Sequence, residues 1–426
     1  MVIYVVQSGD SLYSIAQEYG VTVELLQAAN QILPTQPLVI GQALVVPTEF
    51  ITHQVSAGET LFTIARSYGT TVERLVKLNP LTQSDPNFLR VGQLLTVPAV
   101  AEPTGTIAVN GFCYPGIGQS TLDLTLPDLT YLSPFSYMFT ETGTLVPVDD
   151  ARLINAAYTK NVAPLMVIAN TIPGEGFSSE LASVVLNDMD IQSTLIENIA
   201  INLDEKNYFG LNIDFEYIFP RDREAYNAFL ERLVARLRPI GYVLSSAVAP
   251  KISAGQQGTL YEAHDYEAHG RLLDYVVIMT YEWGYTYGPP MAVAPVDQVE
   301  RVLQYAVTEI PPAKILMGMP NYGYDWTLPY VSGTAARTLS NVAAVRLAAD
   351  TGSEILFDEV AQSPYFNYRV NGVEHVVWFE DARSIQAKLR LVEQYGLGGV
   401  SYWTVNQYFS QNWLVLNSMF NVEKRF

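Results

Sequence analysis

The stretch Phe209-Gly210-Leu211-Asn212-Ile213-Asp214-Phe215-Glu216-Tyr217 alternates strictly between apolar and polar side chains. Successive side chains of a β-strand point to opposite faces, so the polar residues Asn212, Asp214 and Glu216 share one face. In a barrel of parallel strands the apolar face meets the surrounding helices and the polar face points inward. Burying unpaired carboxylates costs several kcal/mol, so these inward acids need a function. We therefore expect catalytic groups at the C-terminal end of a barrel strand.

Strand-like apolar runs recur on both sides of this stretch and alternate with helical segments. Seven more are expected: Ile107–Tyr114, Tyr131–Tyr137, Ala163–Ile168, Val243–Ala247, Tyr275–Tyr281, Ile315–Met319 and Gly399–Trp403. Eight strands within residues 107–426 predict an α/β fold, a (β/α)8 TIM barrel. The interval before the last strand is too long for one helix and contains the hairpin turn Asn371-Gly372. We expect a small α+β insertion at about 323–385 that forms one wall of a cleft.

The first hundred residues contain an internal repeat. Ser8-Gly9-Asp10-Ser11-Leu12 recurs 49 residues later as Ala57-Gly58-Glu59-Thr60-Leu61. The offset grows to 51 at Gly41-Gln42 and Gly92-Gln93, which places two extra residues in a loop of the second copy. Each copy predicts a small β-α-α-β module, one at 1–48 and one at 51–98, followed by a linker at 99–106.

Composition narrows the classes of partner. The formal charge of −19 disfavours nucleic acid and acidic membranes, and no apolar run is long enough for a membrane span. The N-terminus lacks the pattern of a secretory signal, so classical export is not expected. The one cysteine, Cys113, cannot form an internal disulfide and is interpreted as a core residue. The four histidines lack ligand spacing, so neither a metal nor a cofactor is expected.

The repeated module resembles the LysM module, which binds glycans that contain N-acetylglucosamine. The resemblance implies carbohydrate binding at the turn after the first strand. The implied residues are Gly9, Asp10, Ser11 and Leu12 in the first copy and Gly58, Glu59, Thr60 and Leu61 in the second. The alternative is that both turns serve only to start a helix.

The stretch that ends at Glu216 resembles the motif Asp-Gly-x-Asp-x-Asp-x-Glu on the fourth barrel strand of family 18 glycoside hydrolases. The resemblance implies that Glu216 is the general acid and later the base. Asp214 would orient the substrate acetamido group, whose carbonyl oxygen attacks the anomeric carbon in a retaining, substrate-assisted reaction. Two positions depart from the motif, Phe209 and Asn212. Asn212 is expected to line the substrate site but cannot share a proton with Asp214.

Two further segments resemble parts of the same family. Met279-Thr280-Tyr281-Glu282 is similar to its Met-x-Tyr-Asp segment, which implies that Tyr281 donates a hydrogen bond to the acetamido oxygen. Trp403, at the end of the eighth strand, would form an apolar floor under the sugar. By pattern alone, Tyr281 and Trp403 could instead be core residues. The other substrate-binding residues implied are Met279, Glu282, Trp283, Asn321 and Tyr322.

Two glycan-binding modules joined to a hydrolase point to a polymeric substrate. Tandem LysM copies without an export signal resemble the spore cortex-lytic N-acetylglucosaminidases of spore-forming bacteria. We therefore expect cleavage of N-acetylglucosaminyl linkages in cortex peptidoglycan or its fragments during germination. The protein would be made in the mother-cell cytoplasm and lie in the coat or cortex region of the spore. The alternatives are a chitinase and a catalytically silent glycan-binding or spore-coat protein. The sequence does not indicate an oligomeric state.

Overall fold

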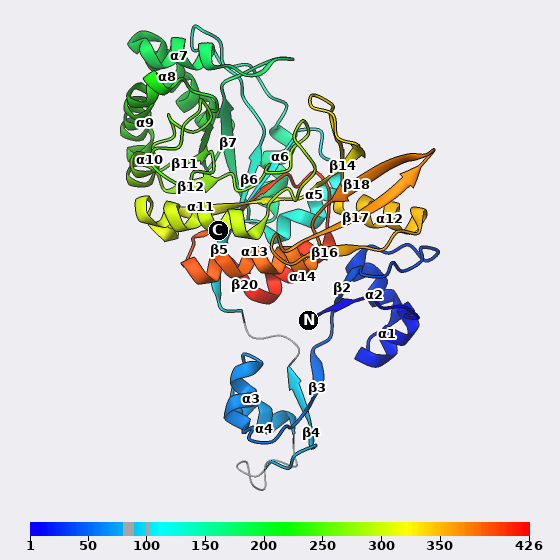
Figure 1. Cartoon of the computed structure of the whole chain (residues 1–426). Helices are drawn as coiled ribbons and strands as arrows, with labels where there is room; N and C mark the ends of the chain where they lie inside the picture. The colour runs from blue at the N-terminus through cyan, green and yellow to red at the C-terminus, as the bar shows by residue number, and fades with distance from the viewer. Residues whose placement is uncertain (80–88, 99–102) are drawn as a thin grey trace.

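Eight parallel strands close into a barrel in the C-terminal part of the chain (Figure 1). The computed structural model describes residues 1–79, 89–98 and 103–426. The strand order is cyclic, and β19 pairs with β5 to close the sheet, with Gly399 opposite Ala108. The barrel strands are β5 (Gly105–Cys113), β6 (Tyr131–Pro134), β7 (Ala163–Ala169), β10 (Gly210–Asp214), β11 (Val243–Val248), β12 (Tyr275–Ile278), β13 (Ile315–Pro320) and β19 (Gly399–Trp403). The predicted TIM barrel is therefore confirmed.

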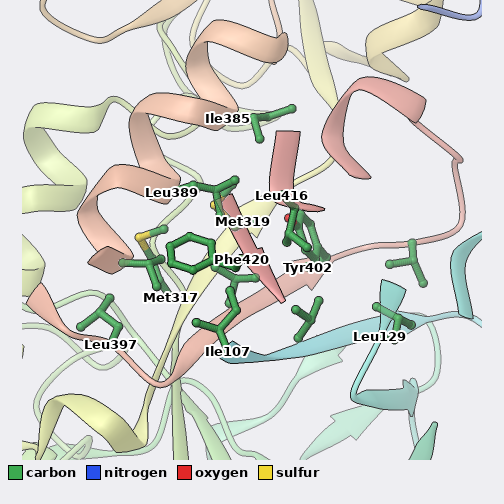
Figure 2. Packing of buried hydrophobic residues seen from close by; sticks show 14 of the residues in the cluster. Ile107, Leu129, Met317, Met319, Ile385, Leu389, Leu397, Tyr402, Leu416 and Phe420 are labelled. Atoms are coloured by element: carbon green, nitrogen blue, oxygen red, sulfur yellow. The ribbon is translucent and has the colours of Figure 1, made fainter. Parts of the chain in front are cut away.

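Helices cover the outside of the barrel. They are α5 (Gln119–Thr125), α6 (Ala151–Thr159), α7 (Ser179–Asn187), α8 (Met189–Glu205), α9 (Arg223–Leu237), α10 (Tyr266–Leu272), α11 (Val296–Glu309), α13 (Ala382–Tyr395) and α14 (Ser410–Met419). Figure 2 shows how Met317 and Met319 of β13 and Tyr402 of β19 meet Ile385 and Leu389 of α13 and Leu416 of α14. A short strand, β20 (Phe420–Val422), follows α14 and pairs with β5. No helix within the described ranges is both long and apolar enough to cross a membrane.

Strands β10 and β12 end earlier than the sequence pattern suggests. The ladder of β10 stops at Asp214 and that of β12 stops at Ile278, so Glu216 and Tyr281 lie beyond the strands on which they were expected. The alternation continues through Phe215, which packs with Leu211 and Ile213 against the helices. Alternation reports which face a side chain occupies, whereas the end of a ladder depends on the neighbouring strands.

The insertion before β19 is a five-stranded antiparallel sheet with one helix. Its elements are β14 (Gly323–Leu328), β15 (Arg337–Leu339), α12 (Asn341–Thr351), β16 (Leu356–Asp358), β17 (Ser363–Val370) and β18 (Val373–Trp378). Asn371 and Gly372 form the predicted turn between β17 and β18, with φ of 51° and 79°. Both angles are positive, as a two-residue hairpin turn requires. A smaller hairpin, β8 (Thr171–Ile172) and β9 (Gly176–Phe177), follows β7.

The two N-terminal repeats have the predicted β-α-α-β order. The first contains β1 (Val2–Val5), α1 (Leu12–Tyr19), α2 (Val23–Asn30) and β2 (Ala43–Val46). The second contains β3 (Phe50–Gln54), α3 (Leu61–Ser67), α4 (Val72–Leu78) and β4 (Leu94–Pro98). In each, one asparagine joins the second helix to the closing strand. The Asn30 side chain donates to the carbonyl oxygens of Leu26 and Val45, and Asn79 makes the equivalent bonds.

Two expectations fall partly outside the described residues. The loop expected to hold two extra residues contains 80–88, and the expected linker contains 99–102. Strand β5 already begins at Gly105, inside the expected linker, because its first residues pair with β20.

Candidate active site

Asp214 and Glu216 lie at the C-terminal mouth of the barrel. Asp214 is only 4% exposed, and its Oδ1 accepts no hydrogen bond within the described part of the chain. Burial raises the pKa of Asp214 to about 7. The pKa of Glu216 is raised well above its usual value, first by burial and then by the negative charges of Asp214 and Glu282. This raised pKa favours the protonated form of Glu216, which is the form that a general acid requires.

The backbone that carries Glu216 is held by a side chain that the sequence analysis missed. Asn170 directly follows β7 and is fully buried. Its Oδ1 accepts from the Glu216 N–H at 2.9 Å, and its Nδ2 donates to the Glu216 carbonyl oxygen at 2.9 Å. The Asn170 amide thus makes the two backbone hydrogen bonds that a neighbouring strand would make if β10 continued to Glu216. A polar residue at the C-terminal end of a barrel strand was the available signal.

A second missed residue, His264, holds the preceding peptide. Its Nδ1 accepts from the Ala249 N–H at 2.9 Å, so Nε2 carries the hydrogen and donates to the Phe215 carbonyl oxygen at 2.8 Å. Burial lowers the pKa of His264 to about 4, so the ring is neutral at physiological pH. Nothing in the local sequence around His264 indicates this contact.

Tyr281 follows the end of β12 and is half-buried. Burial and then the charges of Asp214 and Glu216 raise its pKa well above the usual value, so its hydroxyl stays protonated. A Cβ on Gly318 of the neighbouring strand would lie 2.8 Å from the Tyr281 ring, so glycine is what leaves room for the ring. Tyr281 therefore lies within electrostatic reach of the two acids.

Glu282 follows Tyr281 in the sequence, and its side chain links the barrel to the insertion through hydrogen bonds. Its Oε1 accepts from the hydroxyl of Tyr324 at 2.9 Å and from that of Tyr322. Burial raises the pKa of Glu282, and the two hydroxyl groups oppose this shift. Glu282 adopts a left-handed φ of 69°, which is costly for a residue with a side chain and is typical of functional sites.

A pocket of about 380 Å³ lies between the insertion and the loop after β19. Its lining residues are Tyr114, Glu282, Asn321, Tyr322, Tyr324, Thr338, Leu339, Ser340, Trp403, Thr404, Asn406 and Gln407. The Trp403 ring meets Phe135 edge-on, with ring centroids 4.8 Å apart, and also packs on Phe112 and Tyr114. Met279 packs against the same apolar cluster inside the barrel. The structure therefore brings Glu282, Tyr322 and Trp403 to one pocket.

Three other expected substrate residues are engaged in internal contacts. Asn212 is buried and its Nδ2 donates to Ser245 Oγ at 2.9 Å, although its Oδ1 has no partner among the described residues. Asn321 lines the pocket, but its Nδ2 donates to the carbonyl oxygens of Thr404 and Gln407. Trp283 packs against the apolar cluster around the barrel. No group of three or more His, Cys, Asp and Glu side chains that could hold a metal ion occurs in the described ranges.

The expected glycan-binding turns lie in the two N-terminal modules. Asp10 Oδ2 accepts from the Tyr4 hydroxyl and the Gln7 N–H, both at 2.7 Å. In the second module Glu59 Oε2 contacts His53 Nε2 at 2.9 Å and accepts from the Ser56 N–H. Ser11 and Thr60 cap α1 and α3. These side chains therefore shape the turns, whereas Gly9 and Gly58 have open space around them.

Comparison with known proteins extends over the whole chain. The sequence pattern of glycosyl hydrolases family 18 matches residues 116–407, and that of the LysM domain matches residues 4–47 and 53–98. The chain is 45% identical to a cortical fragment-lytic enzyme of Bacillus anthracis, over 99% of each chain.

Two crystal structures of the spore cortex-lytic enzyme SleL are similar throughout. The Bacillus cereus structure has a TM-score of 0.87 and 41% identity, and the Bacillus megaterium QM B1551 structure has a TM-score of 0.90 and 39% identity. Each comparison covers 100% of this chain and 99% of the other. The chain belongs to family 18 of the glycosyl hydrolases, a glycosidase family, and carries two LysM domains ahead of its barrel.

Proposed function

We propose that this protein hydrolyses N-acetylglucosaminyl linkages in spore cortex peptidoglycan, or in its fragments, during germination. The observation that carries the proposal is the pair of acids at the barrel mouth, a buried Asp214 and a half-buried Glu216, with the pKa of Glu216 raised by desolvation and by Asp214. The similarity to cortical fragment-lytic enzymes over nearly the full length supports the choice of substrate. The LysM domains would hold the enzyme on the polymer, in the cortex or coat region of the spore.

The mechanism uses the substrate acetamido group as the nucleophile. Glu216 donates its proton to the glycosidic oxygen while the acetamido carbonyl oxygen bonds to the anomeric carbon and the leaving sugar departs. Asp214 accepts a hydrogen bond from the acetamido N–H, and Tyr281 donates one to its oxygen. Water then attacks the anomeric carbon, Glu216 takes a proton from it, and the acetamido group is restored. Two displacements retain the configuration.

Digestion of purified cortex fragments tests the function. The wild-type protein should release products that end in N-acetylglucosamine, identified by mass spectrometry. Glu216→Gln should be slower by about 10²–10⁴ because general acid assistance is lost, whereas the exposed control Glu141→Gln should match wild type. Cleavage of chitin oligosaccharides alone would favour a chitinase. Folded protein that cleaves neither substrate would favour a silent glycan-binding or coat protein.

Asp214→Asn should stabilise the fold at alkaline pH while it impairs catalysis. The folded pKa of about 7 is above the usual aspartate value, so the contribution of Asp214 to the stability of the fold is most favourable below about pH 4, falls as pH rises toward 7 and levels off above that. The side chain of Asp214→Asn does not ionise, so this loss of stability does not occur in the variant. The Tm of Asp214→Asn minus that of wild type should therefore increase between pH 5 and pH 8. The increase should be on the order of a few degrees. The exposed Asp149→Asn serves as the control, and an equal gain at both pH values would contradict the assignment.

Glu282→Gln should move the alkaline limb of the pH–rate profile to lower pH. The charge of Glu282 raises the pKa of Glu216, so removing it lets Glu216 lose its proton earlier as pH rises. The measurement is kcat against pH on soluble cortex fragments, with the position of the limb as the readout. A limb that stays in place would show that Glu282 does not act on the proton of Glu216.

Asn170→Ala should lower kcat by about ten- to a hundredfold with little change in KM, because Glu216 loses both backbone restraints. The exposed Asn155→Ala is a matched control on the outer surface. A rise in KM with normal kcat would contradict a positioning role for Asn170.

A further inference from the structure

The first LysM domain is packed on the barrel through its strands. Met1, Ile3 and the fully buried Val45 join the apolar cluster that contains the residues of α13 and α14. In Figure 1 this domain, in dark blue, lies against α14 and the insertion, whereas the second domain, in lighter blue, stands apart from the barrel. The two copies of one module therefore have different surroundings.

A buried glutamine on α14 anchors the first domain. Gln411 Nε2 donates to Asn30 Oδ1 and to the Ala43 carbonyl oxygen, both at 2.9 Å. Its Oε1 accepts from the Ala382 N–H at the start of α13. Buried polar groups that are fully paired specify one arrangement, so this contact fixes the orientation of the domain.

The first domain also holds the loop after β19, residues 404–409. Gln31 Oε1 accepts from the Ser410 N–H at 2.8 Å, and Gln31 Nε2 lies 3.3 Å from the Tyr408 carbonyl oxygen. The neighbouring Gln407 lines the pocket and bonds to Asn321. One wall of the pocket is therefore secured from outside by Gln31.

The same domain holds the opposite wall. Val39 is 5% exposed and is part of the apolar core of the insertion, with Ile355 and Phe366. The Ile355 N–H donates to the Ile40 carbonyl oxygen at 2.9 Å. Leu339 packs against this core and also lines the pocket. A continuous chain of contacts thus runs from Val39 to the wall of the pocket.

Gly41 allows the close approach to the insertion. Its φ is 81°, and a Cβ there would lie 1.8 Å from the Ile355 carbonyl oxygen. The Gly41 carbonyl oxygen accepts from Arg383 Nη2 at 3.1 Å. Gly92, its counterpart in the second domain, has φ of 84°, and the nearest atom to its Cβ position is 3.8 Å away. The backbone conformation is shared, but only at Gly41 would a Cβ clash with a neighbouring part of the protein.

Other counterparts differ in the same way. Leu94 of the second domain is 65% exposed, whereas Ala43 at the matching position of the first is 3% exposed. The second domain buries its own small core around Ile64, Leu75 and Leu95. Contact with the barrel is therefore a property of the first copy and not of the module as such.

We propose that the first LysM domain is a clamp on the pocket lined by Glu282, Tyr322 and Trp403: it joins the insertion to the loop after β19 and so fixes the distance between the two walls of this pocket. The inference rests on the proposed function insofar as the pocket binds substrate. The clamp leaves the two acids untouched, because Asp214 ends strand β10 and the backbone of Glu216 is held by Asn170 and His264 within the barrel. Its effect is on binding and not on proton transfer.

Gly41→Ala tests the clamp, with Gly92→Ala as the matched control. Both substitutions carry the same penalty for a positive φ, but only the first also clashes with Ile355. On soluble cortex fragments Gly41→Ala should raise KM about tenfold with kcat changed by less than about threefold, whereas Gly92→Ala should leave both unchanged. The pH–rate profile should keep its limbs in both variants.

Hydrogen exchange gives a readout that needs no activity. In Gly41→Ala the amides of residues 337–341 and 404–409 should exchange faster, and in Gly92→Ala they should not. If residues 31–41 exchange faster while both pocket walls and KM stay as in wild type, the clamp is refuted. An inactive wild-type protein would instead refute the proposed function, and the exchange data would still decide the clamp.

Gln31→Asn is a second variant in case Gly41→Ala does not fold. Gln31 has φ of 52°, a conformation that asparagine tolerates. The shorter side chain loses the bonds to Ser410 and Tyr408, so exchange should rise at residues 404–409 and KM should rise. Wild-type exchange at residues 404–409 together with a wild-type KM in Gln31→Asn would overturn the proposal.

Discussion

The placement of two carboxyl groups, one buried and one half-buried, at the end of one barrel strand is the constraint on which the site depends. Desolvation raises the pKa of both acids and so favours their neutral forms, and the negative charge of Asp214 raises the pKa of Glu216 further. The protein loses stability by keeping them, which is a common cost of catalytic function. Fixed neighbours are needed so that this unfavourable arrangement does not relax. Asn170 and His264 supply them by bonding the backbone on either side of the second acid.

The apolar and polar alternation of residues 209–217 was sufficient to predict the barrel strand, its inward acids and their place at the mouth. The same reasoning located the other seven strands and the Asn371-Gly372 turn, because these features depend on residues close together in sequence. It did not locate the end of β10, since a ladder ends where the neighbouring strands diverge. Asn170 and His264 were missed because their hydrogen bonds to Glu216 and Phe215 join residues that are 46 and 49 positions apart in the sequence.

Residues expected to contact the substrate fall into two groups that sequence could not separate. Glu282, Tyr322 and Trp403 share a pocket, whereas Asn321 gives its amide hydrogens to the loop after β19. Asn212 similarly bonds to Ser245 of the adjacent strand. An asparagine beside an active site can face the ligand or brace the protein, and only its partners distinguish these roles. The acidic turns of the LysM domains show the same ambiguity, because Asp10 and Glu59 are both bonded within their own turns.

Gly41 and Gly92 illustrate how duplicating one sequence motif within a single chain places its copies under different constraints. The two glycines serve the same turn, yet a Cβ on Gly41 would clash with Ile355, whereas one on Gly92 would only reach ordinary van der Waals distance from Gln54. The copies are therefore not interchangeable, although their folds agree. Residues of the first copy that pack against the barrel and the insertion are under a steric constraint that their counterparts in the second copy lack. The two halves of the repeat are therefore expected to diverge at different rates among descendants of this chain.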